Sequence, residues 1–158
     1  MNSLAINHSL SFQERKEVIR HLTKVKRQYP SLQHHLYKIK KKNEEDEFTV
    51  IYTIVLNPES EIYKVHFPER PITPGSCLVE VAQELLENDL GESLCLKTII
   101  DLNYFNPINP QKSFIIDFHI NKIEKEIKTD ELEVVVRVED KNEQFALLKL
   151  SFDRQPKN

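Results

Sequence analysis

One segment of the chain, residues 76–90 (SCLVEVAQELLENDL), combines helical spacing with a broad apolar face. Its apolar side chains recur three and four residues apart, as on one side of an α-helix; they are Leu78, Val81, Ala82, Leu85 and Leu86. The only two glycines of the chain flank this segment, Gly75 before it and Gly91 after it. Gly91 stands where a left-handed C-terminal cap is favoured, because glycine adopts that conformation without a steric penalty. The sequence therefore predicts one helix that must bury its apolar face against another layer.

Much of the remaining chain has the composition of β-strands. Residues 48–56 (FTVIYTIVL) are rich in β-branched and aromatic side chains, and further strand candidates follow the helix at 94–105, 112–124, 131–139 and 144–152. Residues 36–40 form a short strand candidate, and 40–47 (KKKNEEDE) a charged hairpin turn. A second helix is predicted over 12–28, opened by a capping box of Ser11 and Glu14. We expect an α+β fold, with an antiparallel sheet of five or six strands against helix 76–90 and an extra N-terminal helix.

Length, composition and charge exclude several classes of protein. The 158 residues are expected to form a single domain, residues 1–158, and two glycines cannot form a glycine-rich phosphate loop. A net charge of −3 with both signs interspersed gives no argument for a nucleic-acid partner. No stretch approaches 18 apolar residues, so no membrane span is expected, and the N-terminus lacks the pattern of a signal peptide. The expected location is therefore the cytoplasm, with Cys77 and Cys95 as reduced thiols.

The segment from Val65 to Glu80 (VHFPERPITPGSCLVE) holds the residues best suited to chemistry. Three prolines within seven residues stiffen the connection, which ends at Gly75, where the predicted helix begins. The N–H groups and partial positive charge of a helix N-terminus suit a developing oxyanion. His66 precedes this rigid loop, and Glu80 lies in the first turns of the helix.

Each of these features also has an ordinary structural explanation. A lone histidine beside Phe-Pro is more often structural than catalytic, an acidic stripe on a helix is usually solvated, and Pro-Gly is common at a helix start. Cys77, two residues past Gly75, is expected to be a buried apolar side chain rather than an activated nucleophile. The residue spacing alone therefore leaves catalysis open.

The whole motif His66-Phe67-Pro68-x-Arg70-Pro71-x-x-Pro74-Gly75, followed by Glu80, resembles the active-site segment of a known family. This family is the 3-hydroxyacyl-[acyl-carrier-protein] dehydratases of type II fatty-acid synthesis. Its histidine and acidic residue are fourteen positions apart and its glycine follows the histidine by nine, as they do here. Residues 102–110 (LNYFNPINP) are similar to another segment of the family, which carries aromatic residues and prolines. The resemblance implies the hot-dog fold, in which an antiparallel sheet wraps around a long central helix.

The resemblance also implies an activity: dehydration of a (3R)-hydroxyacyl thioester on acyl carrier protein to the trans-2-enoyl thioester, with no metal or organic cofactor. His66 is then expected to take the α-proton, the Gly75 amide to polarise the thioester carbonyl, and Glu80 to protonate or position the departing hydroxyl. In the family the histidine and the acid come from different subunits, so a homodimer or a higher homo-oligomer is expected. Arg70 and the lysines of residues 38–42 are candidates for contact with an acidic carrier protein, with solvated surface as the alternative.

Three positions depart from the family's motif. The family usually has glycine before the histidine and after Phe-Pro, where this chain has Val65 and Glu69. The family tends to have glutamine four residues after the acid, where this chain has Glu84. Since two carboxylates at this spacing on one helix face repel, we expect either Glu80 or Glu84 to retain a proton more readily. Two alternatives stay open: thioester hydrolysis, because hot-dog folds also host thioesterases, and acyl binding without catalysis, which these departures motivate.

Overall fold

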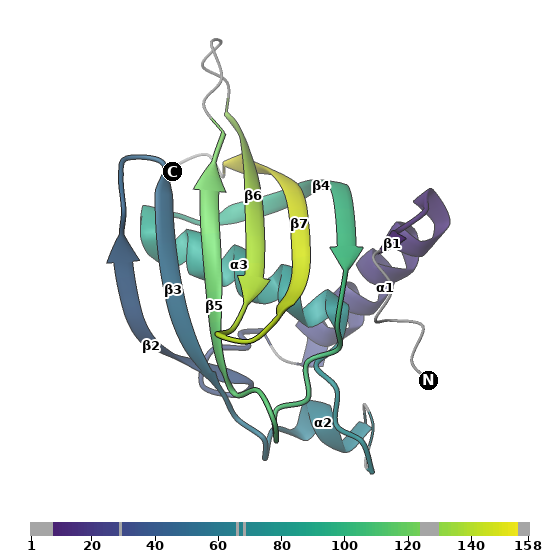
Figure 1. The fold of residues 1–158 in the computed structure, drawn as a ribbon. Helices are drawn as coiled ribbons and strands as arrows, with labels where there is room; N and C mark the ends of the chain where they lie inside the picture. The colour runs from purple at the N-terminus through teal and green to yellow at the C-terminus, as the bar shows by residue number, and fades with distance from the viewer. Residues whose placement is uncertain (1–7, 29, 66, 68, 124–129, 155–158) are drawn as a thin grey trace.

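The computed structural model describes residues 8–28, 30–65, 67, 69–123 and 130–154. In this part of the chain, one antiparallel sheet has the strand order β1-β4-β7-β6-β5-β3-β2 (Figure 1). Its strands are β1 (His8–Ser9), β2 (Tyr37–Glu44), β3 (Thr49–Leu56), β4 (Leu94–Tyr104), β5 (Ile115–Lys122), β6 (Glu131–Glu139) and β7 (Gln144–Arg154). The helices are α1 (Phe12–Gln28), α2 (Glu61–Val65) and α3 (Gly75–Leu90). Because β1 has only two residues, the sheet has six full strands, which confirms the predicted α+β class and antiparallel sheet.

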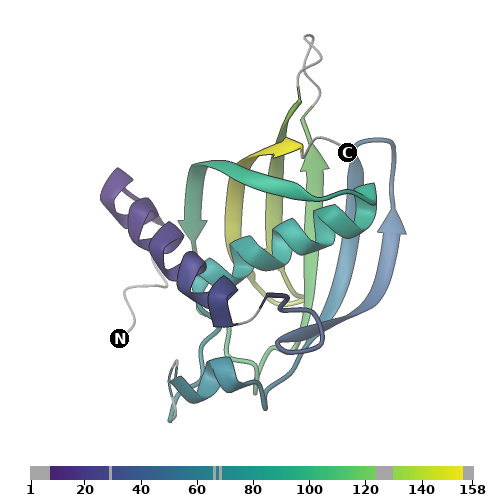
Figure 2. The same cartoon turned by 180° about the vertical axis from the view of Figure 1, so that it is seen from behind.

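Helix α3 lies along one face of the sheet, and the sheet curves around it (Figures 1 and 2). The five apolar residues predicted for its buried face are each at most 5% exposed. Alternate side chains of β5 and β6 complete the core, as the period of two predicts; they are Ile116, Phe118, Ile120, Val134, Val136 and Val138. The helix ends at Gly91, whose φ of 68° is left-handed and whose N–H donates to the carbonyl of Glu87. The central helix is thus confirmed, and it begins one residue earlier than predicted.

Helix α1 packs beside the N-terminal end of α3 (Figure 2). Its bounds match the prediction, and its capping box forms. The N–H of Ser11 donates to the Glu14 carboxylate (3.0 Å), and the N–H of Glu14 donates to the Ser11 hydroxyl (3.2 Å). Leu22 points from α1 into the core. Among the described residues, no helix is both long and apolar enough to cross a lipid bilayer.

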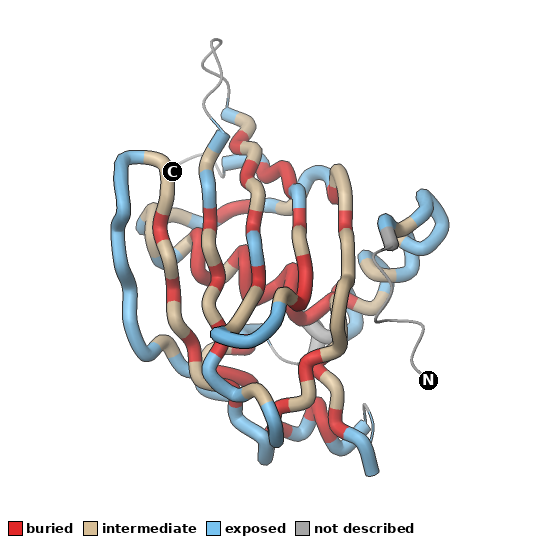
Figure 3. The backbone as a smooth tube through the Cα atoms, in the orientation of Figure 1, coloured by how far each residue is buried: buried red, intermediate tan, exposed pale blue. Residues whose placement is uncertain are grey.

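Two local predictions were wrong. Residues 41–44, predicted as part of a turn, continue β2 and pair with β3 as far as Glu44 opposite Val50. β2 is an exposed edge strand (Figure 3), and charged side chains are tolerated on such edges because they point into solvent. The second correction is α2, which was not predicted. It is a single turn held by the Ser60 hydroxyl, which accepts from the N–H of Ile62 at 3.3 Å.

Candidate functional site

A cavity of about 350 Å³ opens at the N-terminal end of α3. Its volume lies in the range of small-molecule sites, roughly 300–1,000 Å³. Four parts of the chain form it: α1, the loop before α3, the first turn of α3, and the end of β4 with the segment that follows it. The residues that line it are His21, Phe67, Ile72, Thr73, Pro74, Gly75, Leu78, Tyr104, Asn106, Pro107 and Ile108. Most of these side chains are apolar, so the cavity suits a ligand with a hydrocarbon part.

The loop that leads into α3 is held by two hydrogen bonds at Thr73. The N–H of Thr73 donates to the carbonyl of Ile108 (2.8 Å), and its hydroxyl is bonded to the hydroxyl of Tyr63 (2.7 Å). Pro74 then precedes the helix and provides no side-chain cap. Among the described residues, no acceptor takes the N–H of Gly75. The structure therefore confirms Gly75 at the helix entrance and places it at the cavity.

The cavity wall includes two polar side chains, those of Tyr104 and His21, that were not predicted as site residues from the sequence. Tyr104, the last residue of β4, packs its hydroxyl against Gly75: a methyl group placed on Gly75 would lie 2.3 Å from that oxygen. His21 comes from α1 and is hydrogen-bonded through Nδ1 to the hydroxyl of Ser76, 55 positions further along the chain. Tyr104 falls in the segment that resembles the dehydratases, which was a usable signal. The sequence contained no such signal for His21, because only the packing of α1 on α3 brings this residue to the cavity.

The structure describes only one of the two other residues of the predicted catalytic set. His66 lies outside the described residues, so its role stays a prediction; Phe67, the next residue in the sequence, lines the cavity. Glu80 is buried in α3 and is not among the residues of the cavity wall. The described part of one chain therefore brings Gly75, but not Glu80, to the cavity.

Cys77 is fully buried in the first turn of α3. Burial, followed by the negative charge of Glu80, raises the pKa of the Cys77 thiol to about 12. A thiol with such a pKa stays protonated at neutral pH and is a poor nucleophile. The expectation that Cys77 is a buried apolar side chain is confirmed.

Glu84 serves a structural purpose. Its carboxylate accepts hydrogen bonds from the N–H of Leu32 (2.8 Å), the N–H of Gln33 (3.0 Å) and the hydroxyl of Tyr37 (2.9 Å). Glu84 therefore ties α3 to the loop before β2 and is not part of the cavity wall. That either Glu80 or Glu84 retains a proton stays a prediction.

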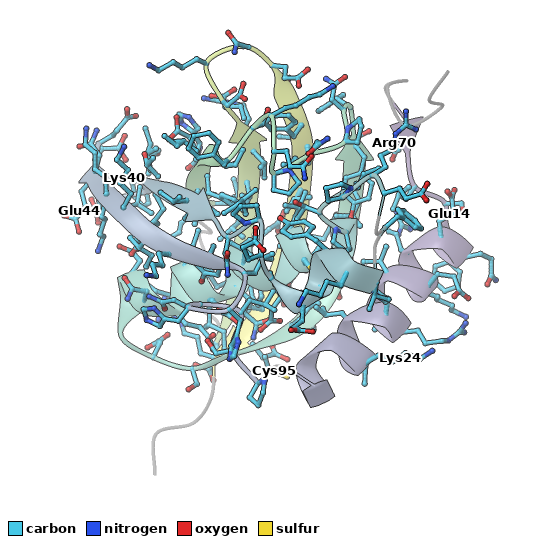
Figure 4. All side chains as sticks on the ribbon, turned by 90° about the horizontal axis from the view of Figure 1, so that it is seen from below. Glu14, Lys24, Lys40, Glu44, Arg70 and Cys95 are labelled. Atoms are coloured by element: carbon cyan, nitrogen blue, oxygen red, sulfur yellow. The ribbon has the colours of Figure 1, made fainter. Side chains whose placement is uncertain are left out.

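The basic residues considered for carrier-protein contact do not form one patch. Lys40 lies on the edge strand β2, and Arg70 lies in the loop before α3. Figure 4 shows these two side chains on opposite sides of the molecule. A single docking surface would have to use one group or the other.

Solved structures with this fold include dehydratases and thioesterases. The dehydratase heterocomplex ApeI:P from Xenorhabdus doucetiae is 15% identical, with a TM-score of 0.56, over 73% of this chain and 96% of that chain. The putative thioesterase YhdA from Lactococcus lactis is 12% identical (TM-score 0.56), over 79% and 96%. The thioesterase HI1161 from Haemophilus influenzae is 12% identical (TM-score 0.54), over 92% and 91%. These likenesses confirm the hot-dog fold.

Comparison at the level of sequence families is more specific. No curated protein sequence matches this chain. The family model described as "ApeI-like: ApeI dehydratase" matches residues 40–146, which is more than half of the chain and includes the whole motif from His66 to Glu80. The chain therefore belongs to the ApeI-like dehydratase family of hot-dog proteins.

Proposed function

We propose that this protein dehydrates (3R)-hydroxyacyl thioesters of acyl carrier protein to trans-2-enoyl thioesters. The observation that carries the proposal is the open N-terminus of α3, where Gly75 meets an apolar cavity in a chain of the ApeI-like dehydratase family. The apolar walls suit an acyl chain. The helix N-terminus suits the carbonyl oxygen of a thioester, on which negative charge develops during the reaction.

Removal of the α-proton is the difficult step, because this proton is only weakly acidic. As the C–H bond breaks, its electron pair moves toward the carbonyl oxygen, and a positioned N–H donor at that oxygen lowers the barrier. We assign this donor to the Gly75 amide, supported by the dipole of α3. We assign the proton to His66, because imidazole changes its charge near neutral pH and is therefore suited to general-base catalysis.

Glu80 would complete the reaction by protonating or positioning the departing hydroxyl, which leaves as water. Glu80 does not line the cavity of its own chain. In the family that the motif resembles, the histidine and the acid come from different subunits, so the proposal places Glu80 in a site shared between two subunits. A homodimer is the simplest assembly that provides such a site. The related ApeI:P dehydratase from Xenorhabdus doucetiae is a heterocomplex, so a second, different hot-dog chain is the alternative partner.

Thioester hydrolysis remains the competing enzymatic function, since YhdA and HI1161 are described as thioesterases. Acyl binding without catalysis is the third candidate, because Val65 and Glu69 replace glycines of the dehydratase motif. Val65 ends α2 and is exposed, which places this departure in the chain segment that leads to the cavity.

The test is an assay of the purified protein with (3R)-hydroxyacyl thioesters of acyl carrier protein over a range of chain lengths. We expect each thioester to lose one molecule of water, and mass spectrometry detects this loss. We expect His66→Ala and Glu80→Gln each to lower kcat by about 100-fold or more, the usual contribution of general acid–base catalysis. The exposed residues His35 and Glu59 provide matched controls, and His35→Ala and Glu59→Gln should retain full activity.

Three results would contradict the proposal. Unchanged turnover in both site variants would remove the roles of His66 and Glu80. Release of free thiol in place of water loss would identify a thioesterase. Binding of the acyl thioester without either product would identify an acyl-binding protein.

A further inference from the structure

The hydroxyl of Tyr104 lies in the cavity wall beside Gly75. Its backbone is paired on both sides, with His8 of β1 and Ala146 of β7, so the sheet fixes where the side chain starts. The ring lines the cavity, and a methyl group on Gly75 would lie 2.3 Å from its oxygen and 2.4 Å from Cζ. In a helix the Cα–Cβ direction tilts toward the N-terminus. The Tyr104 hydroxyl therefore lies at the open end of α3, beside Gly75, which lines the cavity.

The Tyr104 hydroxyl is shielded from solvent and has no hydrogen-bond partner among the described residues. The other tyrosines whose side chains the structure describes are all paired: Tyr37 with Glu84 (2.9 Å), Tyr52 with Asn88 (2.8 Å) and Tyr63 with Thr73 (2.7 Å). Leaving a buried hydroxyl without a partner destabilises the folded protein. This exception points to a partner that arrives with a ligand.

The hydroxyl is a donor under physiological conditions. Burial raises the pKa of Tyr104 above its usual value, so the phenol stays protonated at neutral pH. Cys77 behind it is likewise a neutral thiol, since its pKa is raised to about 12. Most of the cavity wall is apolar, and its polar side chains, those of His21, Thr73 and Asn106, form no hydrogen bond with the Tyr104 hydroxyl. An acceptor oxygen in an otherwise apolar ligand fits the place of the missing partner.

We propose that the Tyr104 hydroxyl donates a hydrogen bond to the carbonyl oxygen of the bound acyl thioester, as a second donor beside the Gly75 amide. The inference rests on the proposed function for its thioester substrate. When the α-proton leaves, the electron pair of the C–H bond shifts toward this oxygen. The electron pair then forms the C=C bond as the β-hydroxyl takes up a proton and departs as water. Two fixed donors stabilise the oxygen at the moment of highest charge.

The decisive variant is Tyr104→Phe, which removes only the hydroxyl. Its matched control is Tyr52→Phe, which removes another tyrosine hydroxyl that contacts α3, at Asn88 near the opposite end of the helix. We expect Tyr104→Phe to lower kcat by about 100-fold, as for loss of one oxyanion donor, with little change in KM. Its melting temperature should equal or exceed that of the wild type, because a buried unpaired hydroxyl is gone. The Tyr52→Phe protein should keep its kcat.

A spectroscopic measurement separates polarisation of the carbonyl from packing. The probe is a trans-2-enoyl pantetheine thioester labelled at the carbonyl carbon, observed by infrared difference spectroscopy when bound. We expect its carbonyl stretch to lie at lower frequency on the wild type than in water, and to return toward the solution value on Tyr104→Phe.

Several outcomes would overturn the inference. They are a kcat of Tyr104→Phe within about threefold of the wild type, a higher kcat, and a loss of kcat with an unchanged carbonyl stretch. If the wild type dehydrates no substrate, the proposed function fails, whereas the infrared comparison still decides the role of Tyr104. If the probe binds to neither protein, both proposals fail.

Discussion

At the scale of single residues, Glu84 accounts for one departure from the dehydratase motif. Three donors converge on its carboxylate, two from the backbone at Leu32 and Gln33 and one from the Tyr37 hydroxyl. A carboxylate has two acceptor oxygens, whereas glutamine has one and brings an NH₂ group that needs an acceptor of its own. The three hydrogen bonds to the loop before β2 and to Tyr37 therefore explain why this position has glutamate and not glutamine.

We predict that Glu84→Gln destabilises the protein. One donor at this site would lose its acceptor, at a cost of about 1–3 kcal/mol in the free energy of unfolding. Urea unfolding at neutral pH measures this change, with the exposed Glu59→Gln as the matched control. Equal midpoints for the two variants would show that the Glu84 contacts do not hold the loop.

At the scale of secondary-structure elements, the two ends of α3 serve different purposes. The N-terminal end opens into the cavity, whereas the C-terminal end is fastened to the sheet through Asp89. Its carboxylate contacts Lys42 of β2 and Lys122 of β5, each at 3.0 Å. Burial acts to raise the pKa of Asp89, but the hydrogen bonds and charges of Lys122 and Lys42 outweigh it, so the pKa lies below its usual value.

This lowered pKa predicts a pH dependence of stability. Since the folded-state pKa of Asp89 is below the unfolded value of about 3.9, its contribution is present above that pH and is lost as the pH falls through the folded pKa. The difference in unfolding free energy between the wild type and Asp89→Asn should therefore be constant near neutral pH and shrink below about pH 4. Unfolding curves across this range provide the measurement. If the difference in unfolding free energy does not change with pH, the ion pairs of Asp89 are not its source. The same holds if the exposed Asp130→Asn variant shows an equal difference from the wild type.

At the scale of the whole molecule, β4 leaves part of one sheet edge open. One side of β4 pairs with β7 along its length. On the other side, among the described residues, β1 pairs only with Asn103 and Tyr104. Side chains of α3 hold the backbone of Leu94. Among the described residues, the stretch from Cys95 to Ile99 has no strand on this side, and such an open edge favours pairing with another strand. A second copy of β4 would pair with this edge and provide the shared site proposed above.

We predict that the protein is a dimer in solution, with about twice the 18.6 kDa mass of one chain by light scattering. Lys97 lies at a bulge in the pairing of β4 with β7, a position where proline is tolerated within the sheet. Lys97→Pro should therefore keep the fold but disrupt the open edge and yield monomers. Lys97→Ala, which removes only the ion pair with Glu131, should stay dimeric. A dimer that survives the proline would place the interface elsewhere, and a monomeric wild type would direct the search to a different partner chain.

The sequence alone determined most of the elements, because their signals are local. The capping box of Ser11 and Glu14 set the start of α1, Gly91 set the end of α3, and alternation of apolar residues placed β6 at its observed bounds. β2 was misplaced because edge strands need no apolar alternation, and only pairing with β3 reveals them. That residues 1–158 form one domain stays a prediction.

Only the tertiary structure decided what surrounds Gly75. The motif identified Gly75 and the helix entrance, since those depend on neighbouring residues. His21 and Tyr104 reach the same cavity from α1 and from the end of β4, positions set by helix packing and by the order of strands in the sheet. The Tyr104 hydroxyl, which has no partner among the described residues and lies beside Gly75, results from contacts between distant parts of the chain. No local pattern encodes such contacts, because they depend on the packing of the whole fold.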